Sequence, residues 1–423
     1  MKTNDAVEAF KQKIGDSAYR KLLLRLQTVN THIAQYGIRW YNDRTLMLTG
    51  YAYGEFYDWD LYFENIYMSY YGISCFCRNN VESFLNEQLE CGYVPRFLMN
   101  RQKWQRNFFR QHFKPFLAQA VLMGCRQSGR YEWLEGKYYQ RLCKYLDHWV
   151  WYWDFDKNGL CVWDSSDHSG MDNQFSRAGA ISSMAIEGVD LNCYLVREFE
   201  AIAEIAEQLG FSADASAFGV KAAQIAAKID AVLWNEKDHF YYDRNERTGQ
   251  VVPVKSISGF TPMWVGFSPA LRVEQMVKEH LLNPDEFWRP WPVATYAKTE
   301  PDYSPQRVGT ECTFRGAVWI PTNYMIFHGL LKYGFTKEAE QLAYRTFEMV
   351  LREEQTREFY NAENGCGQGL NPFWGWTTLA YLMPLEFELG YDPSDVVHTD
   401  FKPIASELLG LEFPPYVGYR APQ

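Results

Sequence analysis

The sequence predicts an all-α fold in which antiparallel helix pairs close into a toroid, with inner helices ringed by outer ones. Three observations lead there. Apolar residues recur at helical spacing, the helical segments come in pairs, and the alternation of strand and helix typical of a nucleotide-binding sheet is absent. No Ser/Gly-rich or Pro-rich linker divides the 423 residues, so we expect one domain over residues 1–423. A ligand site is expected where long loops gather at one mouth of the ring.

Two predicted helix pairs illustrate the pattern. The first helix carries apolar residues at steps of three and four: Leu191, Leu195, Phe199, Ile202, Ala206 and Leu209. Gly210 follows as the expected C-terminal cap, and residues 218–233 repeat the spacing in a second helix. The segments Pro321–Tyr333 and Thr336–Leu351 form another pair joined by a short turn, with Thr336 as the expected N-cap.

Two segments between the helices carry turn signals. The stretch His239–Gln250, HFYYDRNERTGQ, predicts a small β-hairpin inserted as a loop. The stretch Asp154–Gly159, DFDKNG, resembles the start of a calcium-binding loop, with side-chain oxygens at positions one, three and five and glycine at six. The twelfth position is Ser165 and lacks the carboxylate such a loop uses. We interpret it as a turn, leave calcium there open, and predict no other metal site.

Composition and charge narrow the class of protein. The net charge of −10 disfavours nonspecific binding to nucleic acid, and no apolar run is long enough to span a membrane. The first residues, MKTNDAVEAFKQK, show no apolar signal-peptide core, so we expect a cytoplasmic protein. Nine scattered cysteines without CxxC pairs are interpreted as reduced core residues. Aromatic residues make up 17% of the chain, and Trp and Tyr are the side chains that stack on sugar faces.

One basic segment interrupts the acidic chain. From Cys91 to Tyr131 there is no Asp or Glu. The segment contains eight basic residues: Arg96, Arg101, Lys103, Arg106, Arg110, Lys114, Arg126 and Arg130. Such a stretch predicts a local positive field facing an anionic ligand group. A solvated loop or a subunit contact in a homo-oligomer is the alternative.

Three segments combine acids with glycine, serine and aromatic residues, the setting expected of catalytic carboxylates in loops. They are Tyr51–Phe63, Val162–Arg177 and Glu358–Leu379, which reads EFYNAENGCGQGLNPFWGWTTL. Hydrolysis of a sugar bond usually needs two carboxyl groups, one protonated and one ionised. In the first segment, Trp59 and Asp60 would supply a stacking ring and a hydroxyl acceptor.

The third segment resembles the C-terminal signature of glycoside hydrolase family 63: Glu-x-Tyr, a Gly-rich turn, then Pro-Phe-x-Gly-Trp-Thr. SGMDN (Ser169–Asn173) resembles the Ser-Gly-Leu-Asp-Asn of that family. FRGAVWIPTNY (Phe314–Tyr324) resembles a motif shared with the trehalase relatives, and VDLN (Val189–Asn192) also fits. These likenesses run in family order from about Tyr51 to Leu379.

The resemblance implies an (α/α)6 barrel and an inverting α-glycosidase without cofactor or metal. By position, Asp172 would be the general acid and Glu358 the general base. The positions that the resemblance or the basic segment assigns to substrate binding are Tyr53, Phe56, Trp59, Asp60, Gln111, Lys114, Trp163, Gly170, Arg177, Arg315, Trp319, Trp374 and Trp376. Alternatives stay open: Asp172 could be a helix N-cap, Asp164 and Glu363 compete for the catalytic roles, and Arg315 could be an ion-pair partner.

The short members that the chain resembles hydrolyse glucosylglycerate or mannosylglycerate to a hexose and D-glycerate. Gln111, Lys114, Arg177 or a nearby Arg could bind the glycerate carboxylate. The chain departs from the family pattern at Thr313, Phe314 and Ala317, where the family has Tyr, Trp and Pro. A neutral di- or oligosaccharide such as kojibiose, nigerose or trehalose is the alternative substrate. A sugar epimerase with paired histidine bases and a non-catalytic carbohydrate-binding protein are the alternative classes.

Overall fold

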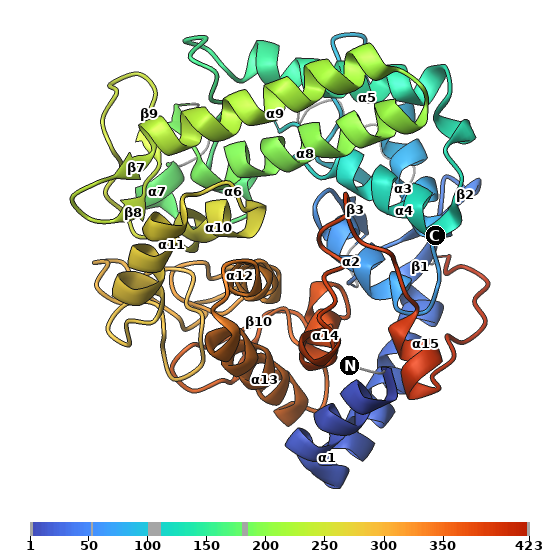
Figure 1. Cartoon of the computed structure of the whole chain (residues 1–423). Coiled ribbons are helices and arrows are strands. Elements are labelled where there is room, and N and C mark those ends of the chain that lie inside the picture. The colour runs from blue at the N-terminus through green and yellow to red at the C-terminus, as the bar shows by residue number, and fades with distance from the viewer. Residues whose placement is uncertain (1–2, 52–53, 100–110, 180–184, 421–423) are drawn as a thin grey trace.

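The computed structural model describes residues 3–51, 54–99, 111–179 and 185–420, and its helices form a closed ring (Figure 1). Among these residues, six inner helical segments contact one another in a cycle. In order they are α2 (Asp60–Ser69), α4 (Leu117–Ser128), α8 (Val189–Gln208), α10 (Thr261–Val265), α12 (Ile320–Lys332) and the 3-10 helix η6 (Trp376–Tyr381), which contacts α2 again and leads into α14 (Met383–Leu389). The predicted all-α toroid is confirmed.

The remaining long helices lie outside this ring. Within the described residues they are α1 (Thr3–His32), α3 (Cys75–Asn86), α5 (Lys137–Tyr152), α9 (Ser212–Val232), α11 (Ala270–Met276) and α13 (Thr336–Arg352). Burial separates the two layers. Every residue of α2 is buried, whereas α13 buries one stripe that includes Leu342, Phe347 and Val350. A helix surrounded by neighbours is buried all round, and an outer helix needs one apolar face.

The predicted helix pairs are present, with one correction at a terminus. Helices α8 and α9 pack against each other, and so do α12 and α13. Thr336 is not the N-cap of α13 as predicted. It is the first helical residue, and Phe335 occupies the cap position without a side-chain hydrogen bond. Gly334 forms the preceding turn with a φ of 79°, a conformation that glycine adopts without strain.

Short strands connect the helices. They are β1 (Ile38–Tyr41), β2 (Thr45–Leu48), β3 (Glu55–Tyr57), β4 (Phe97–Met99), β5 (Val162–Trp163), β6 (Ile186–Glu187), β7 (Trp234–Asn235), β8 (Phe240–Tyr241), β9 (Arg244–Asn245), β10 (Phe359–Tyr360) and β11 (Gly367–Gln368). All pairings between them are antiparallel: β1 with β2, β3 with β4, β5 with β6, β6 with β9, β7 with β8, and β10 with β11.

The hairpin predicted at His239–Gln250 is present only over its second half, where Arg244 bridges antiparallel to Val251 and the Val252 N–H donates to the Asp243 carbonyl at 2.8 Å. The rest of the segment pairs outside it. Strand β8 pairs backwards with β7, and β9 pairs with β6, which lies more than fifty residues earlier in the chain. A tight turn remains within the segment, where the Asn245 N–H donates to the Gln250 carbonyl at 2.9 Å. Turn residues alone do not reveal which distant strand completes a sheet.

Short helices complete the connections. They are α6 (Ser166–Ser169), α7 (Phe175–Ala178), α15 (Ile404–Leu409), the 3-10 helices η3 (Glu132–Leu134) and η4 (Ile257–Phe260), and the π-helical turns η1 (Ile33–Gly37) and η5 (Val277–Leu281). Helices α6 and α7 flank residues 170–174, which include Asp172. The connections between inner and outer helices thus bring the sequence motifs together at the ring.

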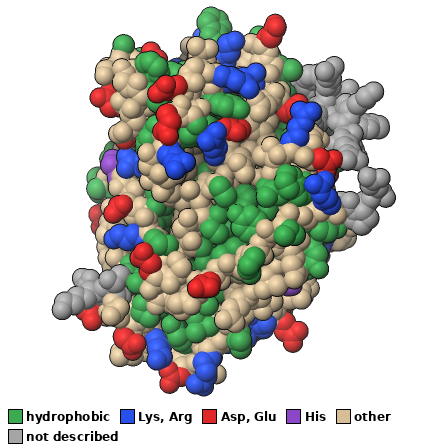
Figure 2. Space-filling view, turned by 90° about the vertical axis from the view of Figure 1, so that its right-hand side faces the viewer, with side chains coloured by type: hydrophobic (Ala, Val, Ile, Leu, Met, Phe, Trp, Pro, Cys, Tyr) green, Lys and Arg blue, Asp and Glu red, His purple; other side chains and the backbone are tan. Residues whose placement is uncertain are grey.

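The surface and the cysteines complete the description. On the face shown in Figure 2, acidic and basic side chains are interspersed. Among the described residues, no helix is both long and apolar enough to cross a membrane. All nine cysteines are free thiols. The prediction that they are core residues is wrong for Cys75, Cys91 and Cys366, which are exposed.

Candidate active site

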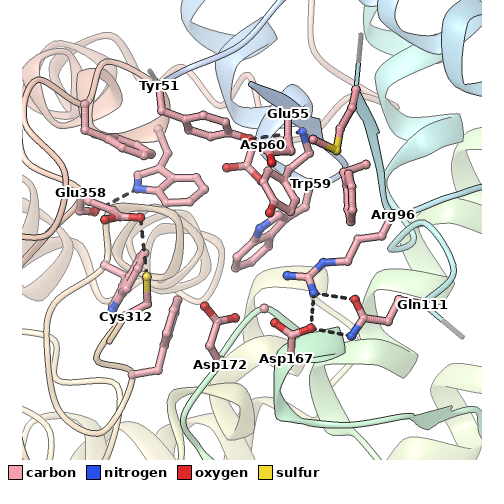
Figure 3. Close-up of a pocket in the computed structure, with 18 residues that line it drawn as sticks. Tyr51, Glu55, Trp59, Asp60, Arg96, Gln111, Asp167, Asp172, Cys312 and Glu358 are labelled. Carbon is pink, nitrogen blue, oxygen red and sulfur yellow. Dashed lines mark hydrogen bonds and ion pairs between the residues drawn. The ribbon is translucent and has the colours of Figure 1, made fainter. Parts of the chain in front are cut away.

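A cavity of about 520 Å³ collects the three acidic and aromatic segments singled out in the sequence (Figure 3). Among the described residues, five carboxyl groups line it, on Glu55, Asp60, Asp167, Asp172 and Glu358. Eight aromatic rings of the described residues line it as well, those of Tyr51, Tyr57, Trp59, Phe97, Phe314, Trp319, Phe373 and Trp376. A hollow with many rings and a few convergent polar groups is the usual form of a small-molecule site.

Glu358 is fixed immediately before β10 by groups from three places in the chain. Its Oε2 accepts the Leu370 N–H at 2.9 Å, and its Oε1 accepts the Cys312 S–H at 3.7 Å. The Trp376 indole N–H donates to the Glu358 carbonyl at 3.2 Å. Burial, together with the negative charges of Glu358 and Asp172, raises the pKa of the Cys312 thiol, so this group stays protonated and can donate.

The glycine content of the Glu358–Leu379 segment follows from this arrangement. Gly369 has a φ of 75°, and a Cβ atom there would lie 2.4 Å from Glu358 Oε2. A side chain at this position would therefore both strain the backbone and displace the carboxylate. At the other end of the segment, a Cβ on Gly50 would lie 2.3 Å from the Gly375 Cα, so two backbones meet closely beside the wall of the cavity.

Stacked rings form the wall next to Glu358. The ring centroids of Phe314 and Trp319 are 3.7 Å apart at 13°, and those of Trp319 and Phe359 are 4.6 Å apart at 17°. The Trp319 indole N–H donates to the Thr313 carbonyl at 2.8 Å, which fixes the orientation of the central ring. Trp376 lies across this stack, 5.8 Å from Trp319. Flat apolar faces of this kind match the C–H faces of a sugar ring.

Asp172 reaches the cavity from the loop between α6 and α7. Its backbone carbonyl accepts the Ser166 hydroxyl at 2.8 Å, and the neighbouring Asn173 side chain accepts the Phe314 N–H at 2.8 Å. Asp172 is not a helix N-cap, because Gln174 occupies that position of α7. Burial raises the pKa of Asp172 to about 7, with Asp167 and Glu358 adding to the rise and Arg96 opposing it. The carboxyl group can therefore hold a proton near neutrality.

Asp60 begins α2 and reaches the cavity beside Trp59. Burial and the negative charge of Asp58 raise the pKa of Asp60 to about 8. Asp58 itself is paired with Lys114, whose ammonium lies 3.0 Å from Asp58 Oδ1, and both side chains are fully buried. The Lys114 ammonium also lies 5.5 Å from the Trp59 ring centroid. Lys114 thus supports Trp59 and does not line the cavity.

The opposite side of the cavity carries a polar group of three side chains, Arg96, Gln111 and Asp167 (Figure 3). Arg96 Nη1 donates to Gln111 Oε1 and to Asp167 Oδ2, each at 2.8 Å. Burial opposes ionisation of Asp167, but Arg96 and Gln111 outweigh it and lower the Asp167 pKa. Among the described residues, the Arg96 Nε–H has no hydrogen-bond partner. Four basic residues of the same segment, Arg101, Lys103, Arg106 and Arg110, lie outside the described residues.

Strand alternation explains why one predicted residue lies away from the cavity and several unpredicted ones line it. In β3, Glu55 and Tyr57 line the cavity, while Phe56 is 1% exposed and packs edge-on against Tyr41. Strand β4 pairs with β3 and alternates in the same way: Phe97 and Met99 line the cavity, and Leu98 does not. Side chains of a strand point alternately to opposite faces. The strand alternation could have been predicted from the sequences of β3, EFY, and β4, FLM.

Trp163 and Arg177, both predicted to bind substrate, lie in a buried network behind the cavity. Arg177 forms ion pairs with Asp190 and Asp243, and all three side chains are nearly inaccessible. The Trp163 indole N–H donates to Asp190 Oδ1 at 2.9 Å, and Asp243 Oδ1 accepts the N–H of Val189 at the start of α8. This network joins α7 to α8, and neither of the two predicted residues lines the cavity.

Four other predicted or competing residues also lie away from the cavity. Arg315 is half-buried, with Nη2 3.8 Å from Glu311 Oε2. The Trp374 indole N–H donates to the Thr49 carbonyl at 2.8 Å in a buried layer. Glu363 is paired with Arg289 at 2.8 Å, and Asp164 is buried without lining the cavity. Tyr53 lies outside the described residues.

The structure brings eight of the predicted residues together around the cavity: Trp59, Asp60, Gln111, Gly170, Asp172, Trp319, Glu358 and Trp376. The cavity residues that were not predicted are Tyr51, Glu55, Tyr57, Arg96, Phe97, Met99, Asp167, Cys312, Phe314 and Phe373. Arg96 had a signal as a member of the acid-free segment. None of the described residues that line the cavity is a histidine.

Comparisons with known proteins agree with this picture. The family model described as the mannosylglycerate hydrolase MGH1-like glycoside hydrolase domain matches residues 53–377. A cytosolic neutral trehalase of Kluyveromyces lactis is 30% identical over 118 residues, which cover 28% of this chain and 15% of the relative. A mannosylglycerate hydrolase of Rubrobacter radiotolerans is 26% identical over 200 residues, which cover 47% of this chain and 43% of the relative. The matches thus span less than half the length of either relative.

A solved structure shows the same fold. The crystal structure of a GH63 mannosylglycerate hydrolase from Thermus thermophilus in complex with glucose superposes with a TM-score of 0.67 at 20% identity. The superposition covers 85% of this chain and 99% of that chain. The predicted (α/α)6 barrel is thereby confirmed.

Proposed function

Because the chain belongs to the family of the mannosylglycerate hydrolase MGH1-like glycoside hydrolase domain, we propose that it hydrolyses a small α-glycoside with inversion at the anomeric carbon. One observation carries the proposal. Asp172, a carboxyl group with a pKa raised to about 7, and Glu358, a carboxylate held by a backbone N–H, line one cavity with sugar-sized aromatic faces. An acid and a base in different environments are the pair that glycoside hydrolysis requires.

In the proposed reaction, Asp172 donates its proton to the glycosidic oxygen as the bond to the anomeric carbon breaks. Glu358 removes a proton from a water molecule, whose oxygen attacks the anomeric carbon from the opposite face. The two carboxyl groups are expected to stand about 6.5 to 9.5 Å apart, which leaves room for that water. The hydrogen bonds from Leu370 and Cys312 hold the Glu358 carboxylate at the cavity.

The sugar ring is assigned to the aromatic end of the cavity. Trp59 and Trp376 offer ring surfaces there, and Asp60 offers a carboxyl group for the hydroxyls. Trp319, which is stacked between Phe314 and Phe359, can offer only the edge of its ring. Because the Asp60 pKa is raised to about 8, this group can donate as well as accept near neutrality. The orientation places the leaving group toward Arg96, Gln111 and Asp167.

Arg96 supports glycerate as the leaving group, so that the substrate is glucosylglycerate or mannosylglycerate. Its guanidinium lines the cavity, so it could bind a carboxylate through a charge-assisted hydrogen bond. Gln111 lies beside it and could bind a glycerate hydroxyl. Lys114 and Arg177 are not offered for this role, because both are held in buried ion pairs.

A neutral disaccharide is the second candidate, and one contact favours it. Asp167 lies 2.8 Å from Arg96 and offsets its positive charge at the leaving-group end. Two sugar hydroxyls could then bind Asp167 and Gln111 in place of a carboxylate. A sugar epimerase would need histidine bases, and no described residue lining the cavity is a histidine.

A substrate panel followed by NMR tests the proposal. The panel contains glucosylglycerate, mannosylglycerate, kojibiose, nigerose and trehalose, with the Asp172→Asn variant as the catalytic control. For the two glycerate glycosides, inversion predicts that the β-anomer of the released hexose is seen first, before mutarotation, and that Asp172→Asn abolishes release. Trehalose should give one β-glucose and one α-glucose, because the leaving glucose keeps its configuration. Initial release of the α-anomer from a glycerate glycoside would contradict inversion. Binding without release by the unmodified protein would favour a carbohydrate-binding protein.

A further inference from the structure

A cluster of carboxylates lies away from the cavity, at the turn between α5 and β5. Asp154 and Asp156 belong to this turn, and Glu246 joins them from the residue after β9. One ligand oxygen from each of the three side chains lies within 4.8 Å of the others. Like charges this close repel one another unless a cation or a proton lies between them.

The basic side chains of the turn and of β9 are engaged elsewhere. The Lys157 ammonium donates to the Trp151 carbonyl at 2.8 Å, at the end of α5. Arg244 forms an ion pair with Glu187 at 2.7 Å. Lys157, Lys221 and Lys228 line a pocket together with Asp154, but among the described residues none of these lysines forms an ion pair with the three carboxylates. Burial raises the pKa of Asp154 even though the positive charges of Lys157 and Lys221 oppose the rise.

Asp154 provides an independent sign of a missing ligand. Its side chain is 5% exposed, and Oδ2 accepts the Gly159 N–H at 3.1 Å. Its other oxygen, Oδ1, is buried and has no hydrogen-bond partner among the described residues. Burying a carboxylate oxygen without a partner is costly, so this oxygen calls for a cation or a donor.

We propose that Asp154, Asp156 and Glu246 bind one calcium ion. Calcium prefers six to eight oxygen ligands, and carboxylates, amide oxygens and backbone carbonyls are its usual donors. Asp154, Asp156 and Asn158 occupy positions one, three and five of a calcium-type loop, and Gly159 at position six has a φ of 97°, which gives the sharp turn. Carbonyls and water complete the shell.

Glu246 supplies what the loop sequence lacks. The twelfth position of the loop is Ser165, so the loop itself carries no terminal carboxylate ligand. Glu246 Oε1 accepts the N–H groups of Phe155 and Asp156 at 3.0 and 2.9 Å, which hold this distant carboxylate against the turn. Its second oxygen can then face the ion together with Asp154 and Asp156. A ligand that is about ninety residues away in the chain could not be read from the loop motif.

The ion would join the turn before β5 to the residue after β9, the two ends of the sheet β5–β6–β9. Strand β5 leads into α6 and the loop that carries Asp172. Calcium would therefore stabilise the support of this loop without taking part in the chemistry. Its removal should lower the temperature of unfolding and have a smaller effect on turnover.

Calorimetry on the whole protein, first stripped with a chelator and then dialysed, tests the site with CaCl2 alone as the probe. One saturable site per chain is expected, with Mg²⁺ binding at least about tenfold more weakly because Mg²⁺ demands a tighter octahedral shell. Saturating calcium should also raise the midpoint of thermal unfolding by about 3 °C. Absence of saturable calcium binding at millimolar concentration would overturn the proposal.

Three variants locate the site. Glu246→Gln and Asp154→Asn keep the acceptor oxygens for the local N–H groups, so they should fold and lose calcium affinity by at least about tenfold. Glu207→Gln, an exposed acid at the end of α8, is the matched control and should bind calcium as the unmodified protein does. Unchanged binding in both site variants would place the ion elsewhere and refute the assignment. These readouts do not depend on glycosidase activity.

Discussion

The cavity and the network behind it use the same residue types for opposite purposes. In the cavity, Asp172 is a carboxyl group whose pKa burial raises to about 7, while Arg96, which is paired with Asp167, opposes the rise. Behind the cavity, Asp190 and Asp243 are held by Arg177 in a buried network that also fixes Trp163 and the start of α8. A residue of a sequence motif can therefore either line the cavity or support a loop that lines it. The hydrogen-bond and ion-pair partners of the residue determine which of the two roles it has.

The largest effect is expected from the two cavity carboxyl groups. Asp172→Asn and Glu358→Gln should each lower kcat by about 10³-fold or more, because each removes one half of the acid and base pair. Glu354→Gln, an exposed acid in the segment before Glu358, makes the same charge change and should leave kcat unchanged. Steady-state kinetics on the substrate found in the panel measure all three. If Glu354→Gln lowered kcat as much as the two site variants do, the assignment of Asp172 and Glu358 as the catalytic pair would be contradicted.

A change in the network behind the cavity should act on stability instead. Arg177→Ala leaves Asp190 and Asp243 buried without their cation and should lower the free energy of unfolding by about 3 to 5 kcal/mol. Asp172→Asn should show no such loss. Denaturant unfolding of the two variants side by side measures the contrast. If Arg177→Ala were as stable as the unmodified protein and only bound substrate more weakly, Arg177 would be a substrate-binding residue and not part of the structural network.

The leaving-group end of the cavity should show a selective effect. Arg96→Met removes the guanidinium proposed to bind glycerate and should lower kcat/KM for glucosylglycerate or mannosylglycerate about 10- to 100-fold, the value of a charged hydrogen bond. Neutral disaccharides should be affected much less. Arg130→Met, an exposed residue of the same basic segment, is the matched control. Equal losses on charged and neutral substrates would favour the neutral-disaccharide alternative.

The raised pKa of Asp172 predicts a smaller, graded dependence on pH. Activity should fall above about pH 7 as Asp172 loses its proton, and Asp60→Asn should leave that limb in place. The free energy of unfolding should also depend on the protonation of Asp172. Because its folded pKa is about 7 and its ordinary value is 3.8, the contribution of Asp172 to stability is full below pH 4 and is lost as pH rises to 7. The difference in unfolding free energy between the unmodified protein and Asp172→Asn should change in that window.

Sequence reasoning reached the fold and much of the cavity because helical periodicity and the glycine-rich and aromatic motifs are local signals. It predicted that Phe56 binds the substrate, whereas the two-residue alternation of β3 directs Glu55 and Tyr57 into the cavity. It treated Lys114 and Arg177 as ligand contacts because a sequence does not show that Asp58, Asp190 and Asp243 are their partners. The approach of Glu246 to the Asp154–Gly159 turn was equally hidden, since it depends on strand pairing across the chain.

The most direct test of the central claim, that Asp172 gives the proton and Glu358 activates the water, uses an α-glycosyl fluoride of the sugar found in the panel. Fluoride leaves without needing a proton, so the acid is dispensable for this substrate while the base is still required. Asp172→Asn should therefore hydrolyse the fluoride at a rate close to that of the unmodified protein, whereas Glu358→Gln should remain inactive. Equal loss in both variants, or activity retained by Glu358→Gln, would contradict the assignment.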